Sequence, residues 1–191
     1  MNWFPQYDYI LASKSPRRQQ LLRSLGIDFE VKTKEVDETY PKELSIEEIP
    51  IYLSKKKAQP FKGNLNEKEL LITADTIVCY EGKVLGKPQD TEEARQMLMM
   101  LSGHEHQVIS GVCLTSVKKQ NAFYSVSNVQ FKQLTSQEIE YYIFNYKPFD
   151  KAGAYGIQEW IGTIGITHIE GSFYNVMGLP IQKLYEMIQK F

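Results

Sequence analysis

Strand-forming and helix-forming segments follow one another along this chain in an order typical of a mixed α/β sheet. Several neighbouring strands are separated by a helix, which favours parallel pairing, whereas others are separated only by tight turns at 81–82 and 118–121. We therefore expect an α/β fold with a mixed central sheet flanked by helices. The expected strands cover 7–12, 29–32, 70–80, 83–85, 107–115, 123–133 and 165–170, and the expected helices begin near Pro16, Ser45, Asp90, Thr135 and Pro180.

The composition indicates one globular domain, residues 1–191, built as two lobes, because no segment has the character of a linker. The net charge of −1 provides no overall attraction to nucleic acid or to an anionic membrane, so we expect neither as a partner. The two cysteines, Cys79 and Cys113, lie in apolar runs and indicate a reducing compartment. The first nine residues lack the pattern of a signal peptide, and no apolar run reaches the roughly 18 residues of a membrane span. We therefore expect a cytoplasmic protein.

A short apolar strand leads directly into a basic turn, Ser13-Lys14-Ser15-Pro16-Arg17-Arg18. Ser15 is a good N-cap and Pro16 a good first helical residue, so a helix N-terminus follows the strand. Free N–H groups at such a terminus attract anions, and the Ser13 hydroxyl and the arginine side chains suit phosphate oxygens. The residues alone leave two interpretations open: a phosphate site, or a capped helix with solvated arginines.

Asp75 is the one charged residue in the apolar run Leu70–Tyr80. Burying a lone carboxylate is costly, so such a residue usually has a cation, a metal or a catalytic role, although it can also cap N–H groups at a strand end. Glu38 and the three lysines Lys55–Lys57 supply further acid and base, and at most one of these lysines is expected to point into a site. Lys87 lies on a stiff loop between Gly86 and Pro88.

The segment Asp150–Gln158 contains small residues that permit close backbone approach, and it ends with Gln158, whose amide both donates and accepts hydrogen bonds. Common phosphate-loop, dinucleotide-binding and HExxH motifs are absent from the sequence. His104 and His106 have no further cysteine or histidine nearby to complete a zinc site, and we expect both to be surface or turn residues.

Taken together and in order, these stretches resemble the Maf family of nucleoside triphosphate pyrophosphatases, which is linked to septum formation. The resemblance extends from about Tyr9 to the C-terminus and so covers nearly the whole chain. The matching segments are Leu11–Arg18, Ala74–Thr76, Leu85–Pro88, Leu101–Gly103, Asp150–Gln158, Glu170–Ser172 and Val176–Pro180.

The resemblance implies a single α/β domain with a deep nucleotide-binding cleft between two lobes, paired as a homodimer. It also implies hydrolysis of a nucleoside triphosphate to the monophosphate and pyrophosphate with a divalent metal, Mg²⁺ or Mn²⁺. Asp75 matches the family's proposed general base, and with Glu38 it would hold the metal, since both ions prefer oxygen ligands. Whether Asp75 is base, metal ligand or both stays open. The positions that match the family's cleft residues are Ser13, Arg17, Arg18, Glu38, Lys57 and Lys87.

The substrate class follows from the same resemblance. Arg17, Thr76 and Gln158 match the branch of the family that acts on dTTP and UTP, including modified pyrimidine nucleotides, with a role in nucleotide pool cleaning or cell-division arrest. Glu159-Trp160 departs from the family pattern and lies where it can reshape the base pocket. The alternative is a nucleotide-sensing regulator of septum formation without catalysis. The carboxylates and lysines argue against that alternative, because a pure binder does not need them.

Overall fold

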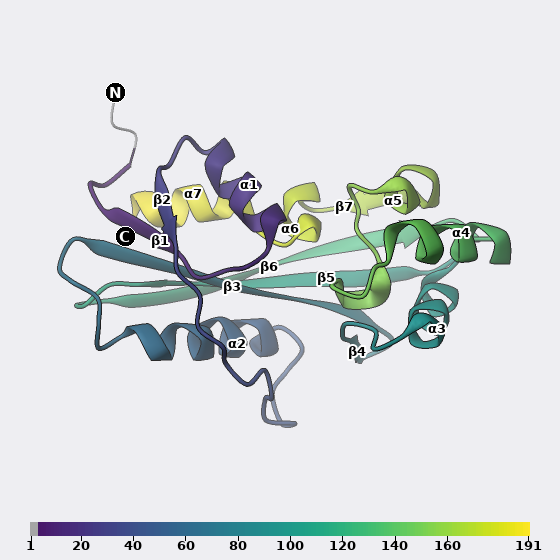
Figure 1. The fold of residues 1–191 in the computed structure, drawn as a ribbon, viewed down its shortest axis with the longest axis horizontal. Helices are drawn as coiled ribbons and strands as arrows, with labels where there is room; N and C mark the ends of the chain where they lie inside the picture. The colour runs from purple at the N-terminus through teal and green to yellow at the C-terminus, as the bar shows by residue number, and fades with distance from the viewer. Residues whose placement is uncertain (1–3) are drawn as a thin grey trace. The chain divides into compact units, whose positions relative to one another are not determined.

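The computed structural model describes residues 4–191 and contains a seven-stranded sheet in the order β2-β1-β3-β5-β6-β7, with β4 paired to β3 (Figure 1). The strand β1 pairs in parallel with β2 and β3, whereas β4 with β3 and β7 with β6 pair antiparallel. The predicted α/β class with a mixed sheet flanked by helices is therefore confirmed. The strands are β1 (Asp8–Leu11), β2 (Phe29–Val31), β3 (Glu69–Tyr80), β4 (Lys83–Leu85), β5 (Glu105–Thr115), β6 (Gln120–Phe131) and β7 (Ile166–Glu170).

The helices include every predicted one and two that the sequence did not indicate. The additional helices α5 and α6 are each too short to give a recognisable apolar period. The helices are α1 (Pro16–Ser24), α2 (Glu48–Ala58), α3 (Thr91–Leu101), α4 (Ser136–Tyr146), α5 (Trp160–Gly165), α6 (Phe173–Met177) and α7 (Ile181–Gln189), with the 3₁₀ turns η1 (Gln59–Phe61) and η2 (Ala152–Ala154).

The chain divides into two compact units. Unit 1 comprises Met1–Asp75, Ser110–Ser125 and Gly178–Phe191, and unit 2 comprises Thr76–Ile109 and Val126–Met177. The long strands β3, β5 and β6 each contribute residues to both units. The single-domain boundaries 1–191 and the cleft between two lobes stay predictions.

Unit 1 is built on three parallel strands, with Tyr9 of β1 opposite Phe29 on one side and Leu70 on the other. The helices α1 and α7 lie on one face of these strands and α2 lies on the other (Figure 1). Strands covered on both faces are apolar on both, and Leu70 and Leu71 of β3 are accordingly completely buried. This arrangement fixes the first half of β3, which leads to Asp75.

The first helix begins as the sequence predicts, whereas the second begins later. The Ser15 hydroxyl accepts from the Arg18 backbone N–H at the start of α1. The capping box predicted at Ser45 forms in part, with the Ser45 N–H donating to Glu48 Oε2 at 2.9 Å, but α2 itself begins only at Glu48. Pro50 provides the reason: it has no N–H to donate to residue 46, so it must lie within the first turn, where an N–H has no helical partner.

Unit 2 has a large apolar core between α3, α4, β5 and β6, and it includes a histidine. The prediction that His106 lies at the surface or in a turn is wrong: the residue is 2% exposed. Its ring stacks on Phe131 at 5.5 Å, and its Nε2 lies 2.7 Å from the Tyr155 hydroxyl. Burial lowers the pKa of His106 to about 4, so the ring is neutral in the folded protein at neutral pH.

The buried histidine should make the stability of the protein sensitive to mild acid. In the unfolded chain a histidine titrates near pH 6.5. Between about pH 6.5 and pH 4 the unfolded state therefore binds more protons than the folded state, so the free energy of unfolding decreases as the pH is lowered. We expect a loss of about 2 kcal/mol between pH 7 and pH 5 from this residue. Urea unfolding at both pH values measures it. The variant His106→Phe should lack this loss, whereas His168→Gln, a change on exposed β7, should keep it. An unchanged loss in His106→Phe would contradict the assignment.

Both cysteines are buried free thiols, as their apolar surroundings predict. Among residues 4–191, no helix has the length and apolar character needed to cross a membrane.

Candidate active site

The candidate site in unit 1 begins where β1 ends beside the middle of β3. Leu11 pairs in parallel with Ile72, and both Ser13, which follows β1, and Asp75, which lies within β3, come after this last pair in the same direction. Ligands of open α/β sheets usually bind at this carboxyl edge. The observed register therefore brings together two of the residues predicted from the sequence.

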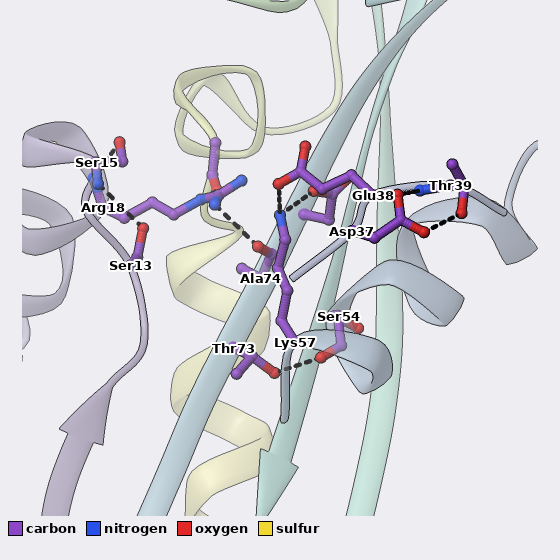
Figure 2. A network of polar contacts seen from close by, with 12 residues as sticks. Ser13, Ser15, Arg18, Asp37, Glu38, Thr39, Ser54, Lys57, Thr73 and Ala74 are labelled. Carbon is purple, nitrogen blue, oxygen red and sulfur yellow. Dashed lines mark hydrogen bonds and ion pairs between the residues drawn. The ribbon is translucent and has the colours of Figure 1, made fainter. Parts of the chain in front are cut away.

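The turn between β1 and α1 is held by its own serines. The Ser13 hydroxyl accepts from the Ser15 N–H at 3.2 Å (Figure 2). The Gln19 amide donates to the Ser13 carbonyl at 3.3 Å. Ser13 is 7% exposed. The turn is therefore preorganised, with the N-terminus of α1 directly after it.

Arg18 binds backbone carbonyls from two distant parts of the sequence. Its Nε donates to the Gly178 carbonyl at 2.8 Å, and its Nη1 donates to the Ala74 carbonyl at 2.9 Å. Burial lowers the pKa of Arg18, and the nearby carboxylate of Asp75 opposes that shift, so from its very high usual value the guanidinium stays charged. The observed contacts make Arg18 a positioning residue for the backbone next to Asp75. Its predicted contact with phosphate stays a prediction.

Lys57 lies between the two acidic residues that the sequence singled out. Its ammonium is 2.5 Å from Asp75 Oδ1 and 2.8 Å from Glu38 Oε1 (Figure 2). The Asp75 side chain is only 10% exposed, whereas that of Glu38 is 50% exposed. One ammonium thus lies between two carboxylates, and the Arg18 guanidinium supplies a second positive charge near them.

The neighbouring lysine has a different role. Lys56 donates to the Asp37 carboxylate at 3.1 Å and to the Thr39 carbonyl at 2.8 Å. Asp37 also accepts from the hydroxyl and N–H of Thr39, and these bonds lower the pKa of Asp37. Lys56 therefore binds the two sequence neighbours of Glu38, whereas Lys57 binds Glu38 and Asp75. The expectation that only one of the three lysines points into the site agrees with this arrangement.

The remaining predicted residues lie elsewhere on the chain. Arg17 follows Pro16 in the first turn of α1, and Thr76 follows Asp75 on β3. Lys87 and Gln158 are exposed residues of two loops in unit 2. These loops are joined by a hydrogen bond from the Gly153 N–H to the Gly86 carbonyl at 3.0 Å.

A comparison with protein-family models gives a match over residues 8–191 to the model described as Maf-like protein. The chain belongs to the Maf family. The predicted resemblance is thereby confirmed over nearly the whole sequence.

Relatives within the Maf family are close. A protein named dTTP/UTP pyrophosphatase from Phocaeicola vulgatus is 55% identical over 186 residues, covering 97% of this chain and 96% of the relative. Proteins of the same name from Bacteroides thetaiotaomicron and Flavobacterium johnsoniae are 55% and 50% identical, covering 97% and 96% of this chain and 96% and 94% of the relatives. A solved HAM1 protein from Coxiella burnetii has a TM-score of 0.49 and 14% identity over 97% of this chain and all of that one, a likeness too weak to support an argument.

The donor atoms of this Maf-family chain fit a divalent cation that arrives with its substrate. Among residues 4–191, no group of three or more histidine, cysteine, aspartate or glutamate side chains is arranged to hold a metal by itself. Glu38 and Asp75 nevertheless converge on a single point, the Lys57 ammonium. One or two carboxylates completed by substrate phosphates are the usual ligands of Mg²⁺ in such sites.

One group of polar residues in this Maf-family chain escaped the sequence analysis. Tyr142 of α4 is completely buried and binds Glu159 and the Gly156 N–H, at the loop that carries Gln158. Its sequence position gives no signal, because Tyr142 falls on the apolar face of α4 beside Ile139 and Ile143. The departure from the family pattern at Glu159 was the available indication.

Proposed function

We propose that this chain hydrolyses UTP and dTTP to the nucleoside monophosphate and pyrophosphate. The observation that supports this most strongly is the buried Asp75 carboxylate within β3, just beyond the carboxyl end of β1, paired with Lys57, which also binds Glu38. A carboxylate with this burial and partner is typical of a catalytic position. The relatives named dTTP/UTP pyrophosphatase supply the substrate class.

The proposed chemistry requires charge neutralisation and a correctly placed water more than covalent catalysis. Ser13, Arg17 and the N-terminus of α1 would bind the phosphate oxygens, together with Lys57, Lys87 and Arg18. Asp75 would accept the proton of the attacking water. Lys57 would move from the carboxylates to phosphate when the substrate binds, since its ammonium lies where the two carboxylates meet.

Glu38 and Asp75 would hold Mg²⁺ or Mn²⁺ together with the phosphates. A divalent cation of this kind neutralises phosphate charge and lowers the pKa of a bound water. The structure supports this role through the pair of convergent carboxylates rather than through a complete site built from protein alone.

The base would be recognised by Gln158, with Arg17 and Thr76. A uracil or thymine edge presents an acceptor, a donor and an acceptor, and an amide side chain matches two of these groups at once. Cytosine replaces one acceptor with a donor. The same residues would then leave a buried group unpaired, which costs about 1–3 kcal/mol.

The test is a comparison of kcat/KM for UTP, dTTP, CTP and 7-methyl-GTP, with each reaction measured as pyrophosphate release in the presence of Mg²⁺. We expect the wild type to prefer UTP and dTTP over CTP by roughly tenfold to a hundredfold, from 1.4 kcal/mol per decade. The variant Gln158→Glu should lose this preference more than it loses turnover in general. A preference for 7-methyl-GTP would contradict the proposed substrate class.

The absence of pyrophosphate release by the wild type would instead favour the alternative of a nucleotide-sensing regulator. The homodimer, the cytoplasmic location and the connection with septum formation stay predictions.

A further inference from the structure

The loop that carries Gln158 is closed by an ion pair between its two ends. Lys151 lies at the start of the loop and is only 7% exposed, and its ammonium is 3.1 Å from Glu159 Oε1 and 2.7 Å from Asp150 Oδ1. Glu159 directly follows Gln158 in the sequence. The position of the residue next to Gln158 is therefore fixed by a contact with the opposite end of the loop.

The second oxygen of Glu159 is held from helix α4. The Tyr142 hydroxyl donates to Glu159 Oε2 and accepts from the Gly156 N–H at 3.0 Å. Burial raises the pKa of Tyr142, so the phenol keeps its proton and remains a donor. A single hydroxyl thus joins the loop backbone before Gln158 to the carboxylate after it.

The next residues along the two segments also meet. The ring of Trp160 lies 4.7 Å from that of Tyr141, the residue before Tyr142 on α4. Helices α4 and α5 pack against each other, as they do in Figure 1. The end of the loop is therefore attached to α4 by a polar contact and by an aromatic one.

The loop is closely packed at two glycines, Gly156 and Gly162. A Cβ atom at Gly156 would lie 2.9 Å from Glu159 Cδ and 3.1 Å from Gln158 Nε2, so the carboxylate and the amide both rest against this glycine. A Cβ atom at Gly162 would lie 1.9 Å from the Ile157 carbonyl oxygen. The exposed Gln158 side chain thus has its amide next to the same glycine that the Glu159 carboxylate contacts.

Helix capping does not explain Glu159. The residue occupies the N-cap of α5, but its side chain makes no capping hydrogen bond. Both of its oxygens instead bind Lys151 and Tyr142. The Glu159 carboxylate therefore serves its contacts with Lys151 and Tyr142 rather than the start of α5.

We propose that Glu159 is a positioning residue for base selection: held by Lys151 and Tyr142, it fixes the Gln158 amide in the orientation that distinguishes a uracil or thymine edge from cytosine. The inference rests on the proposed function, in which Gln158 recognises the base. It assigns the selectivity of the glutamine to a network outside the substrate contact. If the glutamine amide is free to flip, its NH₂ donor and its carbonyl acceptor exchange places, and the side chain no longer distinguishes uracil from cytosine.

The test compares Glu159→Gln and Tyr142→Phe with wild type. Glutamine keeps the shape of Glu159, but its amide NH₂ must face one of two donors, Lys151 or Tyr142. The change Tyr142→Phe removes the hydroxyl that joins Glu159 to Gly156. We expect either variant to reduce the ratio of kcat/KM for UTP over CTP by about tenfold, since one lost hydrogen bond to a charged group has this effect. The loss should appear in KM for UTP, with kcat for UTP within about threefold of wild type.

The matched control is Tyr146→Phe. Tyr146 lies on the same helix, stacks on Tyr142 at 5.1 Å and is 37% exposed, so the UTP-to-CTP ratio should not change. Unchanged ratios in both variants of the network would overturn the positioning role while the proposed function stands. An equal fall of kcat for all nucleotides, together with a lower melting temperature, would reduce Glu159 to a structural role.

Should Glu159→Gln fail to fold, Tyr142→Phe decides the question alone, because its only loss is one hydroxyl. Absence of UTP hydrolysis in the wild type is a separate result. It removes the proposed function, and the inference with it, before any variant is compared.

Discussion

Replacement of Asp75 by asparagine is expected to reduce kcat/KM for UTP by at least about a hundredfold while the protein keeps its fold. The substitution preserves shape but removes the charge that would accept a proton or bind the cation. It also replaces the carboxylate that pairs with the Lys57 ammonium at 2.5 Å by a neutral acceptor. Pyrophosphate release measures the first effect, and thermal melting shows whether the fold persists.

The matched control for this change is Asp37→Asn. Asp37 is another carboxylate in an ion pair with a lysine of α2, but it contacts Lys56 rather than Lys57. Its substitution should leave turnover within a fewfold of wild type. A variant Asp75→Asn that keeps more than about a tenth of wild-type activity would exclude Asp75 as the general base.

Replacement of Lys57 by methionine is expected to have the second largest effect, a fall in kcat/KM on the order of a hundredfold. The change removes a cation that is proposed to move onto the phosphates. It also removes the ammonium that pairs with both Asp75 and Glu38.

Lys56→Met is the control for Lys57→Met. The two lysines are adjacent on α2, and Lys56 binds Asp37 and Thr39 instead of the carboxylates of the site. Its loss should change kcat/KM little. Equal losses in the two variants would mean that a general destabilisation of α2, rather than catalysis, explains the result.

Local signals explain why much of the fold could be predicted. The capping box Thr135–Glu138 forms in full, with both reciprocal hydrogen bonds, because its partners are only three residues apart. The same pattern at Ser45 forms only in part, with the Ser45 N–H bound to the Glu48 carboxylate, because Pro50 shifts the start of α2. His106 was misplaced because β5 begins at Glu105, earlier than expected, and strand alternation then turns His106 inward between exposed Glu105 and Gln107.

The candidate site was harder to predict because its contacts join distant parts of the sequence. The carboxylate in an apolar run identified Asp75, but nothing local to Lys55–Lys57 indicates which lysine reaches it. Arg18 was expected to face phosphate, yet two of its donors bind carbonyls 56 and 160 positions away. Only the packing of β1, β3 and the C-terminal segment determines those partners.

The bond from Arg18 to the Gly178 carbonyl has a consequence for the newly made chain. Gly178 is made 160 residues after Arg18. Until then the arginine has at most the Ala74 carbonyl, the earlier of its two partners, within reach. Chains that stop before Gly178 lack the second of these bonds, so Arg18 then holds the backbone beside Asp75 without its link to the segment before α7.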